Sequence, residues 1–186
     1  EADVELEPTA RFKTQKRPGT DPADIEQALA MLAAAERPAL FIGHGVTLAE
    51  AAPELTEMAE RLNIPVISSP NGMGCIPMSH PLSLGFIGRN GTFPANQAGR
   101  HADLVIAVGA RFDDRSSSSW IPGYSWNFPA TKLIHVDIDV DEIGRNYVPD
   151  LGITSDAGSF LRQILGAAAD TERPQRKAWL AEIEGW

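Results

Sequence analysis

Residues 104–108 have the sequence Leu-Val-Ile-Ala-Val, which is apolar throughout and rich in β-branched side chains. A run of this length and composition is typical of a strand buried on both faces of a sheet. Similar apolar runs at 39–42, 66–68, 133–136 and 151–154 predict further strands, with helical patterns between them. We therefore predict a doubly wound α/β domain with a mainly parallel sheet of about five or six strands and helices on both faces.

Signals for the starts of helices lie before, between and after these strands. Asp21 precedes a proline, a pair typical of an N-cap followed by the first helical residue. Thr47 and Glu50 have the spacing of a capping box and predict that the second long helix begins there. Asp156 is placed to cap the last core helix, and residues 93–102 are expected to form a short helix.

Two long stretches, 69–91 and 109–130, show little periodicity. Loops of this length inside a compact domain are uncommon and are more often functional than idle. The second stretch gathers four aromatic residues, Trp120, Tyr124, Trp126 and Phe128. Aromatic side chains can stack on a bound ring, but we favour a buried interface with another domain.

The chain has 186 residues, 43% of them hydrophobic and 22% charged, with a formal net charge of −9. That size suits one domain that needs no metal or disulfide to fold. No apolar run approaches the ~20 residues that span a bilayer, which argues against a membrane protein. The acidic balance disfavours a nucleic-acid partner. The single cysteine, Cys75, leaves no internal disulfide and favours a reducing compartment, so the cytoplasm is expected.

Gly43 and Gly45 flank His44 directly after a predicted strand. Two glycines there let backbone N–H groups approach a phosphate at the start of the next helix. The third glycine of the dinucleotide-binding fingerprint is missing, with only Ala49 or Ala51 near its place. Glycine turns of this kind also occur without any ligand, so both interpretations stay open.

Gly109 follows the most apolar strand and introduces Arg111 and Arg115. Two arginines four residues apart can hold a diphosphate through bidentate hydrogen bonds. The alternative is local ion pairing with Asp113 and Asp114, which would contribute little to stability.

Asp137 and Asp139 follow the next predicted strand. A carboxylate at a strand end can accept hydrogen bonds from ribose hydroxyls. Asp137 lies much further from Gly43 than the roughly twenty residues of the usual fingerprint. The alternative is helix capping, by Asp139 at the following turn and by Asp156 at the last helix. The four histidines lie far apart, so neither a metal site nor a catalytic group is predicted.

Several stretches, in this order, resemble the central domain of thiamine-diphosphate-dependent enzymes of the acetolactate synthase (acetohydroxyacid synthase) group, over residues 21–166. The most specific are GARFDDR at 109–115 and HVDIDVDEIGRN at 135–146. RPALFIGHG at 37–45, NIPVIS at 63–68 and GFIGRNGTFPAN at 85–96 support them. The fold implied is the Rossmann-like, DHS-like NAD/FAD-binding type.

The resemblance implies FAD in this domain, with ADP or no nucleotide as the alternatives. By position it assigns the following residues to the cofactor-binding surface: Gly43, Gly45, Ser69, Pro70, Gly88, Arg89, Asn90, Gly109, Arg111, Arg115, Asp137, Ile138, Asp156 and Ala157. The two glycine turns and the arginines would meet the diphosphate and ribitol, and Asp137 would meet the adenosine. Two positions depart from the family: His44 replaces a small residue, and Arg89 and Asn90 replace a Met-His pair.

In this family a first domain supplies a glutamate that activates thiamine, and a third binds the diphosphate and Mg²⁺ through a Gly-Asp-Gly motif. No such motif occurs in this chain. We therefore expect residues 1–20 to be a linker from a missing N-terminal domain, 21–168 the central domain, and 169–186 a linker toward a missing C-terminal domain. The full protein is expected to be a homo-oligomeric carboligase or decarboxylase of 2-oxo acids with thiamine diphosphate and Mg²⁺. This chain alone is expected to be inactive.

Two alternatives remain. One is a structural or oligomerisation domain whose pocket is vestigial or takes ADP or a CoA-type ligand in a sister thiamine enzyme. The other is a stand-alone NAD- or FAD-binding protein, such as a sirtuin-like deacylase or part of an electron-transfer flavoprotein. A sirtuin needs a cysteine-based zinc module, which the single Cys75 cannot build.

Overall fold

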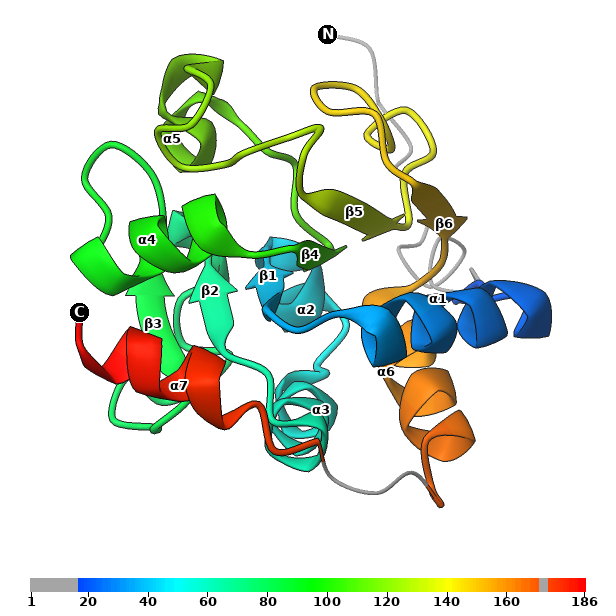
Figure 1. The fold of residues 1–186 in the computed structure, drawn as a ribbon. Helices are drawn as coiled ribbons and strands as arrows, with labels where there is room; N and C mark the ends of the chain where they lie inside the picture. Colours follow the sequence, from blue (N-terminus) through cyan, green and yellow to red (C-terminus); the bar gives the residue numbers. More distant parts are fainter. Residues whose placement is uncertain (1–16, 171–173) are drawn as a thin grey trace, which may run out of the picture.

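The computed structural model describes residues 17–170 and 174–186. Its centre is a six-stranded sheet in the order β3-β2-β1-β4-β5-β6, and every neighbouring pair is parallel (Figure 1). The predicted doubly wound α/β fold is confirmed. The strands are β1 (Pro38–Ile42), β2 (Val66–Ser68), β3 (Ser83–Phe86), β4 (Leu104–Val108), β5 (Lys132–Asp137) and β6 (Leu151–Thr154).

Helices cover both faces of the sheet, with α1, α3 and α6 on one face and α4 and α7 on the other (Figure 1). Alternate residues of a strand pack against the helices on opposite faces, because successive side chains point to opposite sides of the sheet. In β1, Leu40 and Ile42 pack toward the α1 side, whereas Phe41 packs toward the α4 side. The helices are α1 (Pro22–Ala34), α2 (His44–Leu48), α3 (Ala52–Leu62), α4 (Phe93–His101), α5 (Asp114–Ser117), α6 (Ala157–Ala167) and α7 (Lys177–Glu184).

The strand register gathers the carboxyl ends of the central strands at one edge. Ile42 at the end of β1 pairs with Ser68 and Val108, and Val108 pairs with Val136. The strand order reverses between β1 and β4, because the chain builds outward from β1 in one direction and from β4 in the other. Ligands of open α/β sheets bind at such a switch point.

The stretch 69–91, expected to be irregular, contains the edge strand β3. Its sequence, Ser-Leu-Gly-Phe, is short and only half apolar. The strand forms because Val66 of β2 pairs with Ser83 and Ser68 pairs with Phe86, with an irregular register between the two pairs. This pairing depends on residues of another strand, so the periodicity of residues 83–86 does not reveal it.

The predicted capping box at Thr47 and Glu50 is wrong. Thr47 lies inside the short helix α2, and Glu50 adopts a left-handed conformation with φ of 56°. The long helix α3 begins at Ala52, with Pro53 in its first turn. Because proline lacks an N–H and clashes with the carbonyl four residues earlier, it fits only in a first turn. A helix running through from Thr47 is therefore blocked.

The prediction that the loop aromatics form an interface with another domain is wrong for Trp126. This side chain is 2% exposed and its ring lies 4.8 Å from Phe41 and 5.4 Å from Phe112. It belongs to the core on the α4 side of the sheet. Trp120 and Tyr124 are 43% and 41% exposed, so they remain on the surface.

Parts of both stretches predicted as linkers are held by the domain. The backbone carbonyl of Pro18 accepts hydrogen bonds from the Asp156 N–H and the Ser155 hydroxyl. At the other end, Trp179 of α7 is 2% exposed and donates to the Pro38 carbonyl at 3.0 Å. The remaining N-terminal residues lie outside the described residues.

Across the described ranges no helix has the length and apolar character that a membrane span requires.

Candidate functional site

The turns after β1 and β4 touch each other at the switch point. The Gly45 N–H donates to the Gly109 carbonyl at 3.1 Å. A Cβ added at Gly43 would lie 2.0 Å from the Gly109 oxygen, and one at Gly45 would lie 2.6 Å from the Gly109 Cα. Gly109 itself has φ of +57°. The glycines are therefore required by the close packing of two backbone turns, a reason that sequence reasoning missed.

The same turns border a cavity of about 450 Å³ at the carboxyl edge. The exposed His44 lies on its wall between the two glycines, with Nδ1 3.3 Å from the Asn71 carbonyl oxygen. A neighbouring cavity of about 280 Å³ shares Gly45 and Gly109 with the first and extends toward α6. A third, of about 430 Å³, lies beside α5. These three are called the edge cavities below.

Thirteen of the fourteen residues predicted to bind a cofactor line the edge cavities. They are Gly43, Gly45, Ser69, Pro70, Arg89, Asn90, Gly109, Arg111, Arg115, Asp137, Ile138, Asp156 and Ala157. The fourteenth, Gly88, has φ of +113°, and a Cβ there would lie 1.8 Å from the Arg115 carbonyl oxygen. Gly88 thus lets the loop after β3 pack against α5. Their contact with a cofactor stays a prediction.

The arginines of the 109–115 loop do not form the predicted alternative, local ion pairs with Asp113 and Asp114. Arg111 Nε lies 3.9 Å from Glu142 Oε1, and the Arg111 side chain is 72% exposed. Asp114 pairs instead with Arg89 Nη2 at 3.3 Å. Such exposed pairs contribute little to stability. Arg111 and Arg115 therefore stand at the cavity walls as cations available to an anionic ligand.

The carboxylates at the strand ends serve mainly local backbone groups. Asp156 caps α6 by accepting from the Ser159 N–H at 3.0 Å. Asp137 accepts from the Asp139 N–H at 3.0 Å, and Asp139 accepts from the Asp141 N–H at 3.0 Å. The capping alternative for Asp156 is thus confirmed. A carboxylate has several acceptor positions, so each of these groups keeps acceptor capacity beyond its local bond.

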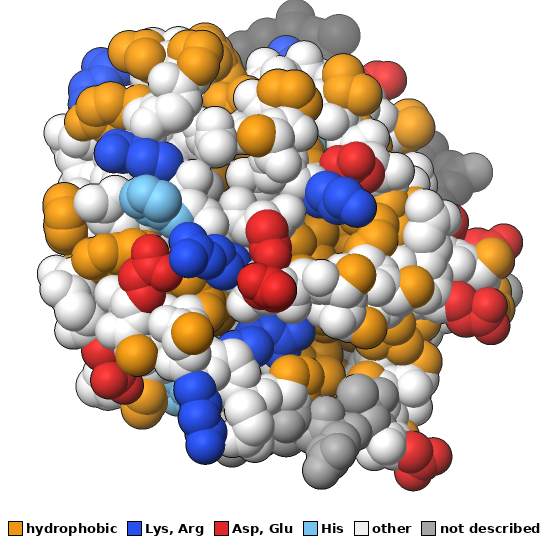
Figure 2. Space-filling model, in the orientation of Figure 1, with side chains coloured by type: hydrophobic (Ala, Val, Ile, Leu, Met, Phe, Trp, Pro, Cys, Tyr) orange, Lys and Arg blue, Asp and Glu red, His pale blue; other side chains and the backbone are white. Residues whose placement is uncertain are grey.

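Arg17 is a cavity residue that sequence reasoning missed. Its Nη1 donates to the Ala49 carbonyl at 2.6 Å and lies 3.9 Å from Asp156 Oδ2. It lines the cavity next to α6. Arg17 belongs to a basic cluster in the predicted linker, and no motif marked it. Figure 2 shows basic and acidic side chains interspersed on the visible face. The distribution of charge on that face therefore does not mark a binding site.

A buried histidine lies beneath the 109–115 loop. His135 in β5 is 1% exposed, and its Nε2 lies 2.9 Å from the Ala110 carbonyl oxygen. Since a carbonyl only accepts, Nε2 carries the proton. Burial lowers the pKa of His135 below its ordinary value, while the Ala110 carbonyl, Asp137 and Glu142 oppose that change. The imidazole is therefore neutral at pH 7.

This histidine makes stability depend on pH. The unfolded chain takes up a proton near pH 6.5, whereas the folded chain resists it, because the folded pKa is lowered. The stability is therefore complete above pH 6.5 and falls below it, by at most about 1.4 kcal/mol per pH unit. Urea unfolding between pH 7.5 and 5.5 will show this loss, and His135→Gln will reduce it. If the free energy of unfolding changed equally with pH in the parent and in His135→Gln, His135 would not be the group responsible.

The model of one protein family, described as "Thiamine pyrophosphate enzyme, central domain", matches residues 25–164. The chain belongs to this family. The match covers all six strands and lies within the predicted central domain, 21–168. The resemblance proposed from the motifs is thereby confirmed. Among the described residues, 17–170 and 174–186, no cluster of three potential metal-ligating side chains occurs.

Curated relatives of this central domain carry a consistent description. This chain is 40% identical over 162 residues to a "Probable acetolactate synthase large subunit" of Methanocaldococcus jannaschii. It is 36% identical to an "Acetolactate synthase large subunit" of Haemophilus influenzae and 35% identical to an "Acetolactate synthase isozyme 3 large subunit" of Escherichia coli. Each alignment covers 87% of this chain but only 27% or 28% of the relative.

Proposed function

We propose that this central domain serves an acetolactate-synthase-like carboligase or decarboxylase of 2-oxo acids, a transferase dependent on thiamine diphosphate and Mg²⁺. The names of the relatives support this reaction class. The chain contains no Gly-Asp-Gly sequence, so thiamine diphosphate and Mg²⁺ are assigned to other domains of the same protein. The domain alone is expected to be inactive, and the lone Cys75 favours the cytoplasm.

Within this protein, the proposed role of the central domain is to hold FAD along the carboxyl edge. The supporting observation is the row of edge cavities at the switch point, bordered by two glycine turns and by Arg111 and Arg115. An elongated site suits an elongated ligand with a diphosphate in its middle. Arginine binds phosphate through paired hydrogen bonds, and Asp137 offers an acceptor for a ribose hydroxyl. The residues present therefore fit such a group.

A second candidate, ADP or a CoA-type ligand, is favoured by the Arg89 cluster. Arg89 Nη2 contacts Asp114 at 3.3 Å and the Ser119 hydroxyl at 2.5 Å on the wall of the third cavity. A cation here differs from the family's usual Met-His pair and suits a phosphorylated end better than a flavin ring. The adenosine of such a ligand would then lie in the two cavities that share Gly45 and Gly109, with its phosphates directed toward Arg89 in the third.

The proposed site predicts saturable quenching of flavin fluorescence when FAD is titrated with the protein. Arg111→Ala will weaken binding about tenfold, because one charge-assisted contact is lost. Arg162→Ala is the matched control, since Arg162 pairs with Glu54 on the surface and does not line the edge cavities. Binding of ADP without FAD would favour the second candidate. Failure of both ligands to bind would contradict a nucleotide role and favour a structural domain.

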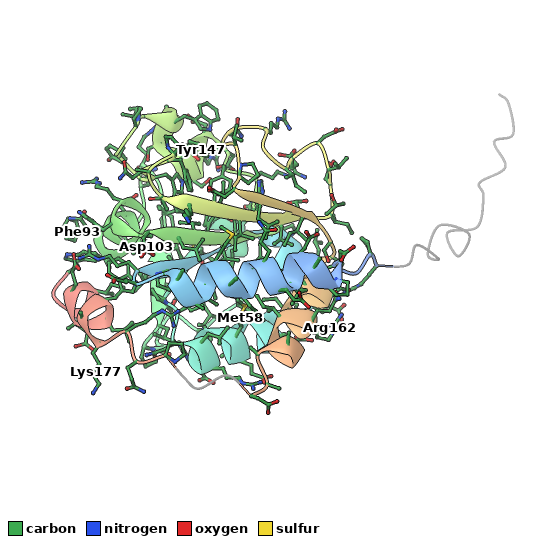
Figure 3. The ribbon with its side chains drawn as sticks, turned by 45° about the vertical axis from the view of Figure 1, so that its right-hand side comes forward. Met58, Phe93, Asp103, Tyr147, Arg162 and Lys177 are labelled. Atoms are coloured by element: carbon green, nitrogen blue, oxygen red, sulfur yellow. The ribbon has the colours of Figure 1, made fainter. Side chains whose placement is uncertain are left out.

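The expected partners are other domains of the same protein and further copies of it. Support comes from large apolar side chains that the described surface leaves exposed. Trp120, Ile121 and Tyr124 lie within five residues of one another and are 41–55% exposed, and Phe93 is 60% exposed. Figure 3 shows Phe93 at the edge of the domain. Exposed apolar groups of this kind commonly mark contact surfaces.

A further inference from the structure

The two most specific motifs of the chain contact each other through hydrogen bonds. His135 is the first residue of the 135–146 motif and donates to the Ala110 carbonyl at 2.9 Å. Asn146 is its last residue, and its side-chain amide donates to the carbonyls of Phe112 at 3.1 Å and Arg111 at 3.3 Å. Three consecutive carbonyls of the 109–115 loop are therefore held by side chains from one distant segment.

These bonds determine how the loop presents its side chains. Because a peptide group is planar, holding its carbonyl also sets the direction of the adjoining N–H. Phe112 has φ of 52°, a conformation that is uncommon for a bulky residue and needs support from its surroundings. Asn146 supplies that support at the Phe112 carbonyl, and Trp120 Nε1 donates to the same atom at 3.0 Å. Arg111 leaves the backbone between two held peptide groups.

His135 has a buried polar atom that destabilises the fold, and packing alone does not explain why a histidine stands there. Its Nδ1 is buried and has no hydrogen-bond partner. Leaving a buried polar atom unpaired is unfavourable, so an apolar side chain would suit the interior better. The ring also stands edge-on to Phe112, with centroids 5.3 Å apart. The hydrogen bond and the ring contact of the imidazole are thus both with the 109–115 loop.

We propose that His135 and Asn146 are positioning residues that hold the 109–115 loop in the conformation that binds the ligand. This inference rests on the proposed nucleotide role, and it adds residues that act through the loop. Neither residue lines the edge cavities. Their effect on a ligand passes through the backbone of residues 110–112.

The test compares variants that keep or remove each donor. His135→Gln keeps an N–H at a similar reach, whereas His135→Leu removes it. Asn146→Asp removes the amide donor at an exposed position where folding is less at risk. The matched controls are His101→Leu and Asn127→Asp, both exposed. The readouts are the FAD dissociation constant and amide hydrogen exchange of residues 110–116, compared with residues 38–42 of β1.

His135→Leu and Asn146→Asp are expected to weaken FAD binding about tenfold and to raise exchange only in residues 110–116. His135→Gln is expected to bind within about threefold of the parent, and the controls are expected to change neither readout. Unchanged exchange in residues 110–116 for both donor-removing variants would overturn the proposal, as would an equal rise in residues 38–42. If the parent binds neither FAD nor ADP, the proposed function fails, while a selective rise in exchange still supports the positioning role.

Discussion

Gly43→Ala is expected to destabilise the protein by about 3 kcal/mol, which is the upper end of the usual cost of overpacking. The added Cβ would lie 2.0 Å from the Gly109 oxygen and 2.6 Å from the Ala110 Cα. Both atoms belong to the backbone, so no side chain can rotate away. One of the two turns must move, and the edge cavities change shape with it. Urea unfolding measures the loss, together with a fall in melting temperature of several degrees.

Gly166→Ala is the matched control for this substitution. Gly166 lies in α6, and a Cβ added there would meet no atom within 4 Å. Since alanine is favoured over glycine in a helix by up to about 1 kcal/mol, this variant is expected to be neutral or slightly more stable. Equal stability of Gly43→Ala and the parent would show that the turn contact is looser than the structure has it.

Trp126→Ala is expected to cost about 3–5 kcal/mol, the range found when a large core aromatic is removed. The side chain is 2% exposed, its ring contacts Phe41 and Phe112, and its Nε1 donates to the Ser116 carbonyl at 3.1 Å. Removal therefore leaves a cavity and an unpaired buried carbonyl. The readout is again the free energy of unfolding in urea.

Trp120→Ala provides the comparison within the same loop. Trp120 is 43% exposed and donates one hydrogen bond to the Phe112 carbonyl. Its loss is expected to cost about 1 kcal/mol. If the two variants were equally destabilised, the division of the loop aromatics into a buried and an exposed set would be wrong.

The sheet could be predicted because five of its strands are short apolar runs. The strand β3 was missed because its side chains are mixed in polarity and its register with β2 is irregular. The start of α3 was misplaced because the Thr47–Glu50 spacing was weighed without Pro53, which permits a helix to begin only just before it. That proline is a signal that sequence reasoning could have used.

The candidate site was predictable to the extent that it follows from topology. The carboxyl ends of neighbouring parallel strands share one edge, so Gly43, Gly109 and Asp137 come together. Arg17 was not predictable, because its place depends on how residues 17–20 dock against β6 and α6. His135 and Asn146 were quoted only as parts of a motif, since their bonds to the 109–115 loop arise from tertiary structure.

Figure 3 shows Tyr147, which follows the 135–146 motif, near α5 and well apart from Lys177 on α7. Its ring centroid lies 5.4 Å from that of Phe112 and 4.8 Å from that of Phe128. The chain that leaves the motif thus joins the aromatic core beneath the 109–115 loop. The aromatic core therefore supports the loop directly, through the ring of Phe112.

The interlocked turns at positions 43, 45 and 109 also bear on how this site can evolve. Backbone contact leaves no room for a side chain at Gly43 or Gly45, whereas His44 between them is exposed and borders a cavity. Substitutions at position 44 therefore change the wall of that cavity without a clash between the two turns. Sequence change in this turn is thus confined to position 44, since any side chain at Gly43 or Gly45 would push the two turns apart.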